Sequence, residues 1–548
     1  MSYSIMFILG IILGIYAYGI FFLGLVHLLY REYIIIYSLL CIVVSYLIFY
    51  KKYNWKTSII YILNCGKLLI KNRFAFFLSI LIFIQALINY IGALAPELSF
   101  DALWYHLTLP KLYLLSHSII HIPGSLIPYS DMPKLGELLY TSALALGDER
   151  MAKLLQFGAG IFCCFLIYRL SRNYVSRKYA LIAVVIFYSN IAVAWESTTA
   201  YIDLIRTVFE LLALWSYLEW FRAKYQKWLY LSAVFTGLAI TTKLLGIGSL
   251  IIFLILLWFS QYKLPLFFRL RSILIYTGVA LLIPLPWFIF SFLHTGNPVY
   301  PFFTSLYPTG ISTTTVNPIL FLQTVIRLFT SASDPVSPIY LIVLPLIFWK
   351  YKTFSKEIKL LSWYSLLALV AWYITPQTGG GRFIIPYLPA FSVLIAYLLF
   401  LLAKQNDLWS NRYRNTLIGL VIFLALTTIV YRGAASVRYL PVIFGDEIKS
   451  EFLSNNLNFS FGDFYDTDEY FKKHIQSSDT VLLYGFHNLY YVDFPFIDAS
   501  WIKKGDRFTY IACQNTALPK RFSHWQLVYT NMKTHVKLYA DGGKVWKY

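Results

Sequence analysis

Residues 74–95 read FAFFLSILIFIQALINYIGALA, an apolar run that carries no charged residue. Coiled as an α-helix that rises about 1.5 Å per residue, this run crosses the roughly 30 Å hydrocarbon core of a bilayer. The chain before it is basic, with cationic side chains at Lys51, Lys52, Lys56, Lys67, Lys71 and Arg73. Because Lys and Arg concentrate in cytoplasmic loops, we expect a transmembrane helix that starts inside and heads outward.

The composition of the whole chain agrees with a membrane protein. Of its 548 residues, 59% are hydrophobic and only 13% are charged, and the mean hydropathy is +0.63. A soluble protein of this size has no interior large enough to bury so much apolar surface. The composition therefore excludes a soluble enzyme, a disordered chain and a nucleic-acid-binding domain. It predicts an all-α polytopic membrane bundle.

The formal net charge of +20 has several explanations in such a protein. Cytoplasmic loops rich in Lys and Arg account for it most simply. Anionic lipid, or a lipid substrate that carries phosphate, would also favour a basic surface.

Counting the apolar spans along the chain in both directions from residues 74–95 gives about thirteen transmembrane helices, with the N-terminus inside and the C-terminus outside. Every strongly basic loop then falls on one side. The apolar run at residues 228–260 is too long for one span, so we split it around Thr242–Gly248. This split places Lys243 at the outer surface.

The same pattern divides the chain into three parts. Residues 1–72 hold two extra N-terminal transmembrane helices and the basic cytoplasmic loop. Residues 73–432 form the main transmembrane module, whose first large outer loop, residues 96–150, is expected to lie along the membrane surface as short amphipathic helices. Residues 433–548 are polar with short β-like runs, which predicts a small extracytoplasmic α/β domain.

Ionisable residues at the membrane surface are candidates for function. The first group on the outer side is Asp101, Tyr105 and His106, directly after the helix at 74–95. A helix-capping Asp beside interfacial aromatics explains the same residues without any function. The second group, Glu196, Tyr201 and Asp203, has a solvated loop as its alternative explanation.

Cations and turn-forming residues supply the remaining candidates. Lys243 follows an apolar run, where it either snorkels to the outer headgroups or binds a lipid phosphate. His294 opens a turn-rich exit, HTGNPVYP. Arg382 follows three glycines on the outer side, which would let the backbone approach a ligand closely, and the planar fork of donors of Arg382 suits phosphate. Carboxylates and cations on one membrane face, beside a hydrophobic bundle, suit transfer of a group from a lipid phosphate.

The ordered series of these motifs resembles the GT-C superfamily, the polytopic glycosyltransferases that use phospholipid carriers and include protein O-mannosyltransferases and aminoarabinose transferases. The resemblance spans roughly residues 74–405. It rests on Asp101…Tyr105-His106, Pro133…Glu137-Leu-Leu-Tyr140, Glu196/Tyr201/Asp203, Gly237…Thr242-Lys243, Gly296-Asn-Pro-Val-Tyr-Pro301 and Arg382-Phe-Ile-Ile-Pro386-Tyr-Leu-Pro389.

The resemblance implies a sugar donor linked to a polyprenyl phosphate or diphosphate, and an active site at the extracytoplasmic membrane face. It assigns Asp101 as the catalytic base, or as a residue that helps to bind a metal, and Lys243 and Arg382 as ligands of the carrier phosphate. The supporting residues that it suggests are Tyr105, His106, Glu196, Tyr201, Asp203 and His294. Many relatives carry two adjacent acids where this chain has Asp101 alone, so we expect no bound metal, and no organic cofactor is implied.

The reaction implied is a single displacement that inverts the anomeric configuration, with a lipid, glycan or protein hydroxyl as acceptor. The partners expected are the lipid-linked sugar, the acceptor and membrane lipids, without nucleic acid. Basic loops on one side fit a bacterial inner membrane.

Three other functions remain open from the residues alone. A transporter or flippase for a lipid-linked solute also needs charges and about a dozen spans, but it favours internal repeats with broken helices at the bilayer midplane, and we find no repeat. A polymerase or ligase of lipid-linked glycans also works on the outer face. A receptor would leave the outer carboxylates and cations unexplained.

Overall fold

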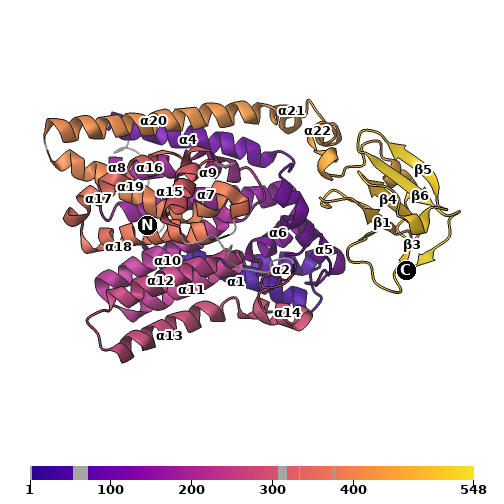
Figure 1. The fold of residues 1–548 in the computed structure, drawn as a ribbon, viewed down its shortest axis with the longest axis horizontal. Helices are drawn as coiled ribbons and strands as arrows, with labels where there is room; N and C mark the ends of the chain where they lie inside the picture. Colours follow the sequence, from indigo (N-terminus) through magenta and orange to yellow (C-terminus); the bar gives the residue numbers. More distant parts are fainter. Residues whose placement is uncertain (1–2, 53–71, 306–316, 332–333, 376, 406) are drawn as a thin grey trace.

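The computed structural model describes residues 3–52, 72–305, 317–331, 334–375, 377–405 and 407–548. Most of the basic loop predicted before residue 73 therefore lies outside the described residues. The described chain is mostly helical, and a small region of β-sheet extends from one end of the helical bundle (Figure 1).

Long apolar helices confirm a multi-pass membrane protein. Seven described helices are long and apolar enough to cross a membrane, or up to eight if a pair of helices bent by 64° counts as one span. The seven are α1 (Tyr3–Leu25), α2 (Arg31–Lys52), α4 (Arg73–Leu94), α7 (Glu149–Ser171), α18 (Lys356–Ile374), the segment Gly380–Lys404, which ends in α19 (Leu388–Lys404), and α20 (Leu408–Val437). The bent pair is α13 (Leu266–Leu282) and α14 (Leu285–Thr295).

The other segments predicted to cross the membrane form helices that are shorter or more charged. They are α8 (Arg177–Tyr188), α10 (Asp203–Ala223), α11 (Gln226–Thr242), α12 (Ile247–Ser260), α16 (Ile339–Ile342) and α17 (Leu344–Lys350). Two further helices are α9 (Ile191–Glu196) and α15 (Pro318–Thr330). The expected count of about thirteen spans stays a prediction.

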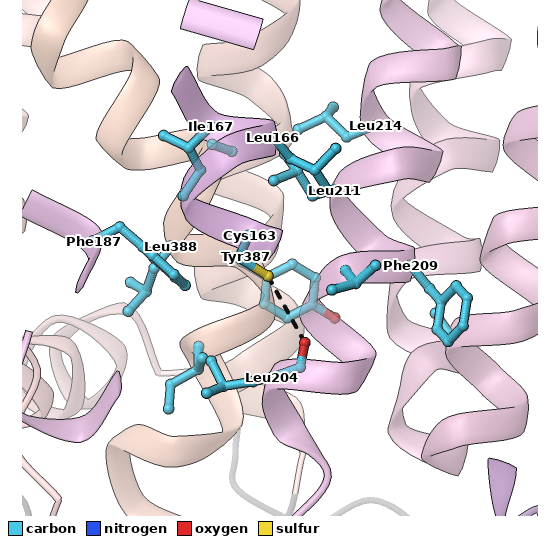
Figure 2. Close-up of a cluster of buried hydrophobic side chains, with 14 of the residues drawn as sticks. Cys163, Leu166, Ile167, Phe187, Leu204, Phe209, Leu211, Leu214, Tyr387 and Leu388 are labelled. Atoms are coloured by element: carbon cyan, nitrogen blue, oxygen red, sulfur yellow. Dashed lines mark hydrogen bonds between the residues drawn. The ribbon is translucent and has the colours of Figure 1, made fainter. Parts of the chain in front are cut away.

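The core of the bundle forms around α10. This helix is buried along nearly its whole length and packs against α7 and α11. Figure 2 shows Cys163 of α7 beside Leu204 of α10, with the Cys163 Sγ 3.8 Å from the Leu204 carbonyl oxygen, and Leu388 of α19 close by. This packing fixes the first residue of α10, Asp203, at one end of the bundle.

The segment predicted to form the first outer loop, residues 96–150, contains a π-helical turn, η1 (Ala102–His106), followed by α5 (Thr108–Ser116) and α6 (Leu135–Leu146). Short helices were expected here, but α6 does not lie as a surface helix. Its residues from Leu135 to Ala143 are buried, and it packs against α1, α5 and α7. Its apolar side chains face protein on all sides, so α6 is part of the bundle.

The predicted break in residues 228–260 is present. The helix α11 ends at Thr242, Lys243 is extended, and a short 3₁₀ turn, η2 (Leu244–Gly246), leads into α12. A Cβ at Gly246 would lie 2.8 Å from the backbone nitrogen of Ile240. Only glycine lets the chain turn this closely against the end of α11.

The C-terminal region holds a mixed five-stranded sheet in the order β2-β1-β4-β6-β5. Its strand β1 pairs in parallel with β2 and β4, whereas β6 pairs antiparallel with β4 and β5. The strands are β1 (Val481–Tyr484), β2 (Phe496–Asp498), β4 (Tyr510–Gln514), β5 (Gln526–Asn531) and β6 (Val536–Ala540), with a separate pair β3 (Arg507–Phe508) and β7 (Trp546–Lys547). Three short helices accompany them, α21 (Leu440–Phe444), α22 (Lys449–Asn456) and α23 (Tyr470–His474). The β-like runs of the sequence thus predicted most of this sheet.

Candidate active site

A cavity of about 260 Å³ lies between the first outer loop, the break between α11 and α12, and the segment that precedes α19. Its walls combine apolar and aromatic side chains with a few charged groups. The charged groups are Asp101, Lys134, Glu137, Lys243 and Arg382. A pocket of this kind, mostly apolar with a few convergent polar groups, is typical of a small-molecule site.

A chain of ion pairs joins the three residues that the sequence singled out most strongly. The Arg382 Nη1 lies 2.8 Å from the Asp101 Oδ2, and the Arg382 Nε lies 3.7 Å from the Asp203 Oδ2. On the other side of Asp203, the Lys243 Nζ donates to the Asp203 Oδ1 at 2.7 Å. Residues more than 250 positions apart in the sequence therefore share one electrostatic network at one end of the bundle.

Local structure around Asp101 holds this carboxylate in place. Tyr105, four residues later on the π-helical turn, donates from its hydroxyl to the Asp101 Oδ2 at 3.3 Å. The Asp101 backbone nitrogen donates to the Tyr201 hydroxyl at 3.2 Å. Burial and the charge of Asp101 raise the pKa of Tyr105 well above its usual value, so Tyr105 remains a hydrogen-bond donor.

Close backbone packing positions Arg382. Gly380 has φ 52° and ψ −133°, a conformation that favours glycine. A Cβ at Gly381 would lie only 2.0 Å from the backbone oxygen of Asp334. The guanidinium of Arg382 then stacks over the Tyr201 ring, 4.6 Å from its centroid. The sequence suggested that these glycines bring backbone close to a ligand, whereas the structure shows Gly381 packed against protein backbone.

A second charged cluster in the cavity consists of His106, Glu137 and Lys134. The His106 Nδ1 lies 2.8 Å from the Glu137 Oε1, and both side chains are buried. Burial opposes the negative charge of Glu137, but Lys134 and His106 outweigh it and lower the pKa of Glu137. Burial lowers the pKa of Lys134, against the opposing effect of Glu137.

Lys134 was not singled out from the sequence. Among the described residues it forms no ion pair, and its Nζ lies 6.0 Å from the centroid of the Tyr105 ring. The signal that could have found it is a cation next to Pro133, directly before an apolar helix in a weakly charged loop.

The structure separates two of the expected site residues from the cavity. Glu196 is fully buried, where the Gln156 side chain donates to its Oε2 at 2.9 Å. His294 lies in the last turn of α14, with its Nδ1 2.8 Å from the Phe290 carbonyl oxygen and its ring stacked on His121. Neither side chain lines the cavity.

The remaining candidates take two kinds of position. Asp101, Tyr105, His106, Lys243 and Arg382 line the cavity. Tyr201 and Asp203 stand directly behind them, in contact with Asp101 and Arg382.

A buried polar network, which we did not predict from the sequence, supports the helices around the cavity. Arg206 pairs with Glu210 at 3.0 Å on α10 and donates to the Tyr387 hydroxyl at 3.0 Å. The hydroxyls of Ser249 and Tyr387 lie 3.0 Å apart. These contacts tie α10 and α12 to the segment that carries Arg382.

Comparisons with known proteins add family and fold. Residues 116–296 match the family model described as dolichyl-phosphate-mannose-protein mannosyltransferase. No curated protein sequence matches the chain significantly.

Two solved structures of ArnT from Cupriavidus metallidurans share the fold. The structure bound to undecaprenyl phosphate is 13% identical in sequence, with a TM-score of 0.55. The match covers 84% of the present chain and 97% of the ArnT chain. The apo structure is 14% identical, with the same TM-score of 0.55 and the same coverage of 84% and 97%. The resemblance expected from the sequence is confirmed by the family match over residues 116–296 and by the shared fold, and the chain is a multi-pass membrane protein with an ArnT-like fold.

Proposed function

We propose that the protein transfers a sugar from a polyprenyl-phosphate donor to an acceptor hydroxyl at the extracytoplasmic membrane face. The observation that carries this proposal is the convergence of Asp101, Lys243 and Arg382 in one network at one cavity. A carboxylate beside two cations supplies a base for the acceptor and positive charge for the leaving phosphate. Undecaprenyl phosphate, which ArnT binds, is a carrier of this chemical kind.

The cations in the cavity suit the change in charge during the reaction. A donor phosphodiester carries one negative charge, and the departing polyprenyl phosphate acquires a second as the bond to the anomeric carbon breaks. Two of these cations, Lys243 and Arg382, already contact carboxylates. A third cation, Lys134, lines the same cavity. Together the three cations stabilise the charge that develops in the transition state.

Asp101 is the proposed base. Both Arg382 and Tyr105 contact its Oδ2, which leaves Oδ1 to accept the proton of the acceptor hydroxyl. When Arg382 turns to the donor phosphate, the Asp101 carboxylate is released to accept a hydrogen bond from the acceptor hydroxyl. The acceptor oxygen bonds to the anomeric carbon, the electron pair of the broken bond goes to the phosphate, and the configuration inverts.

The topology and domain boundaries form part of the same proposal. About thirteen spans, counted from the basic loops, place the N-terminus inside and residues 433–548 outside, in a bacterial inner membrane. The C-terminal region contacts the cavity lining: the centroid of its His487 ring lies 4.7 Å from that of Phe100 and 4.8 Å from that of Trp104, which lines the cavity. This position suits a role in selecting the acceptor.

A labelled donor tests the proposal. Purified protein in sealed vesicles, supplied with a polyprenyl-phosphate sugar labelled in the sugar and with a membrane extract as the source of acceptor hydroxyls, should release polyprenyl phosphate and give a labelled product of inverted configuration. Movement of the intact donor across the vesicle wall, without release of polyprenyl phosphate, would instead identify a flippase.

A further inference from the structure

A second cavity, of about 230 Å³, lies away from the site described above, between the outer ends of α4 and α20. Its walls come from α7, α9, α20 and the segment after α4. We propose that this α4–α20 cavity binds a phosphate group, carried by the headgroup of an anionic lipid in the outer leaflet. The proposal is independent of the reaction at the catalytic cavity.

The charge of the α4–α20 cavity is strongly positive. Three cationic side chains line it, Lys153, Arg432 and Arg438, against one carboxylate, Glu97. None of the three cations forms an ion pair with another residue in the part of the chain that the structure describes. A cavity with this excess of positive charge attracts an anion.

The one carboxylate is already satisfied by backbone donors. The Glu97 Oε1 accepts from the backbone nitrogens of Leu98 at 2.9 Å and Ser99 at 2.8 Å. Its Oε2 accepts from the backbone nitrogen of Ala200 at 2.6 Å. Glu97 therefore shapes the loop and does not neutralise the cations by direct contact.

Arg432 provides the observation that points to a ligand. Its side chain is only 6% exposed. The Arg432 Nη2 donates to the Thr198 Oγ1 at 3.1 Å, but its Nε has no hydrogen-bond partner in the described structure. A buried guanidinium donor without an acceptor is costly. A phosphate oxygen accepts well from the planar fork of arginine and would remove that cost.

The other two cations are arranged around the same space. The Lys153 Nζ donates to the backbone oxygen of Ala95 at 2.7 Å and lies 5.9 Å from the centroid of the Tyr439 ring. The Arg438 Nη2 donates to the Tyr439 hydroxyl at 2.8 Å, and the Arg438 side chain is exposed. Arg438 thus stands at the solvent side of the cavity, with Lys153 and Arg432 buried below.

The surroundings indicate that the phosphate belongs to a lipid. The helices α4 and α20 run side by side along one edge of the bundle (Figure 1). Large apolar side chains are exposed on both helices, among them Leu87, Tyr90, Val430, Tyr431 and Val437. Acyl chains can cover this edge while a headgroup phosphate enters the cavity, as for basic pockets between helices that bind anionic headgroups.

Native mass spectrometry of the delipidated full-length protein tests the inference with three probes: short-chain phosphatidylglycerol, short-chain phosphatidylcholine and inorganic phosphate. We expect phosphatidylglycerol to bind at least tenfold more tightly than phosphatidylcholine, whose choline cancels the phosphate charge. Arg432→Gln should weaken phosphatidylglycerol binding about tenfold or more. Arg438→Gln, at an exposed position that the fold tolerates, should weaken it severalfold even if Arg432→Gln fails to fold.

Two control variants make the result specific. Arg414→Gln removes an exposed charge from the same helix, α20, and should leave binding unchanged. Lys243→Met alters only the catalytic cavity and should also leave this binding in place. Equal phosphatidylglycerol binding by the wild type, Arg432→Gln and Arg438→Gln would overturn the proposal, as would its loss in Lys243→Met. Arg432-dependent binding of inorganic phosphate alone would overturn the lipid assignment.

Discussion

At the scale of single residues, the proposed chemistry depends on which carboxylates and cations meet in the cavity. Asp101 contacts Arg382, and Arg382 bridges toward Asp203, which holds Lys243. Buried ion pairs of this kind add little net stability, because desolvation offsets most of the attraction. Their presence beside a cavity is therefore better explained by chemistry than by folding.

Replacing Asp101 by Asn tests the base directly. Asp101→Asn should lower the rate of sugar transfer by about 10²-fold or more, because positioned general bases contribute roughly this much. The protein should remain folded, with an unchanged elution volume, since Arg382 keeps its contact with Asp203. The matched control Asp148→Asn, at the start of α7 and outside the cavity lining, should transfer at the normal rate. Normal transfer by Asp101→Asn would refute the base assignment.

The pH dependence of kcat/KM tests whether the positive charge of Lys134 takes part in the reaction. A lysine is cationic below its pKa and neutral above it, and burial lowers the pKa of Lys134. The kcat/KM for the donor should therefore fall with rising pH before the usual lysine value of about 10.4 is reached. Lys134→Arg, which stays charged, should move this alkaline limb to higher pH, whereas Lys227→Arg should not. An identical limb in Lys134→Arg and the wild type would exclude Lys134 as the titrating group.

At the scale of elements, the length and charge of sequence segments predicted where the helices lie. They did not predict how deeply each helix is buried. The break before α12 followed from the length of an apolar run, and the structure has it at Lys243. The burial of α6 was not predicted, because a short apolar helix in an outer loop fits a membrane surface as well as a protein interior. Only the packing of α6 against α1 distinguishes the two.

The residues of the site could also be predicted only in part from the sequence. Charges predicted to lie on the outer face pointed to Asp101, Lys243 and Arg382, which the structure brings together. His294 carried the same kind of signal and lies outside the cavity lining. The pair Arg206 and Glu210 was missed because its partner Tyr387 comes from a segment far away in the sequence. Spacing along one chain does not specify such tertiary contacts.

Gly381 tests whether the segment before α19 positions Arg382. In Gly381→Ala the new Cβ would meet the Asp334 backbone oxygen at 2.0 Å, so the backbone must shift. A displacement of about 1 Å at a positioned group costs up to roughly 100-fold in rate. We expect a 10- to 100-fold loss of transfer, measured as kcat/KM. Gly419→Ala, with no atom within 4 Å of the new Cβ, is the control and should keep full activity. Full activity in Gly381→Ala would show that the close packing is unimportant for Arg382.

At the scale of the whole molecule, the C-terminal region is attached to the first outer loop by specific contacts. The Lys111 Nζ donates to the backbone oxygens of Tyr490 and Val492, each at 2.7 Å, and to the Asp493 carboxylate at 2.9 Å. The Tyr491 hydroxyl donates to the Glu97 backbone oxygen at 3.0 Å. These contacts hold residues 433–548 against the segment that carries Asp101.

Lys111→Met should loosen this attachment. Hydrogen bonds of a charged group contribute about 1.5–3 kcal/mol each, so their loss should speed proteolytic cleavage between the bundle and the sheet region about tenfold or more. Limited proteolysis of the purified protein measures this rate. Lys472→Met removes an exposed cation within the C-terminal region and should not change it. Equal cleavage of Lys111→Met and the wild type would contradict a docking role for Lys111.

An experimental map of the protein with undecaprenyl phosphate tests the central claim most directly. We predict density for the phosphate in the catalytic cavity, within hydrogen-bond distance of Lys243, Arg382 and Lys134, with Asp101 on the side away from the lipid chain. A phosphate bound elsewhere, with Asp101 and Arg382 still paired and the cavity without lipid, would contradict the account.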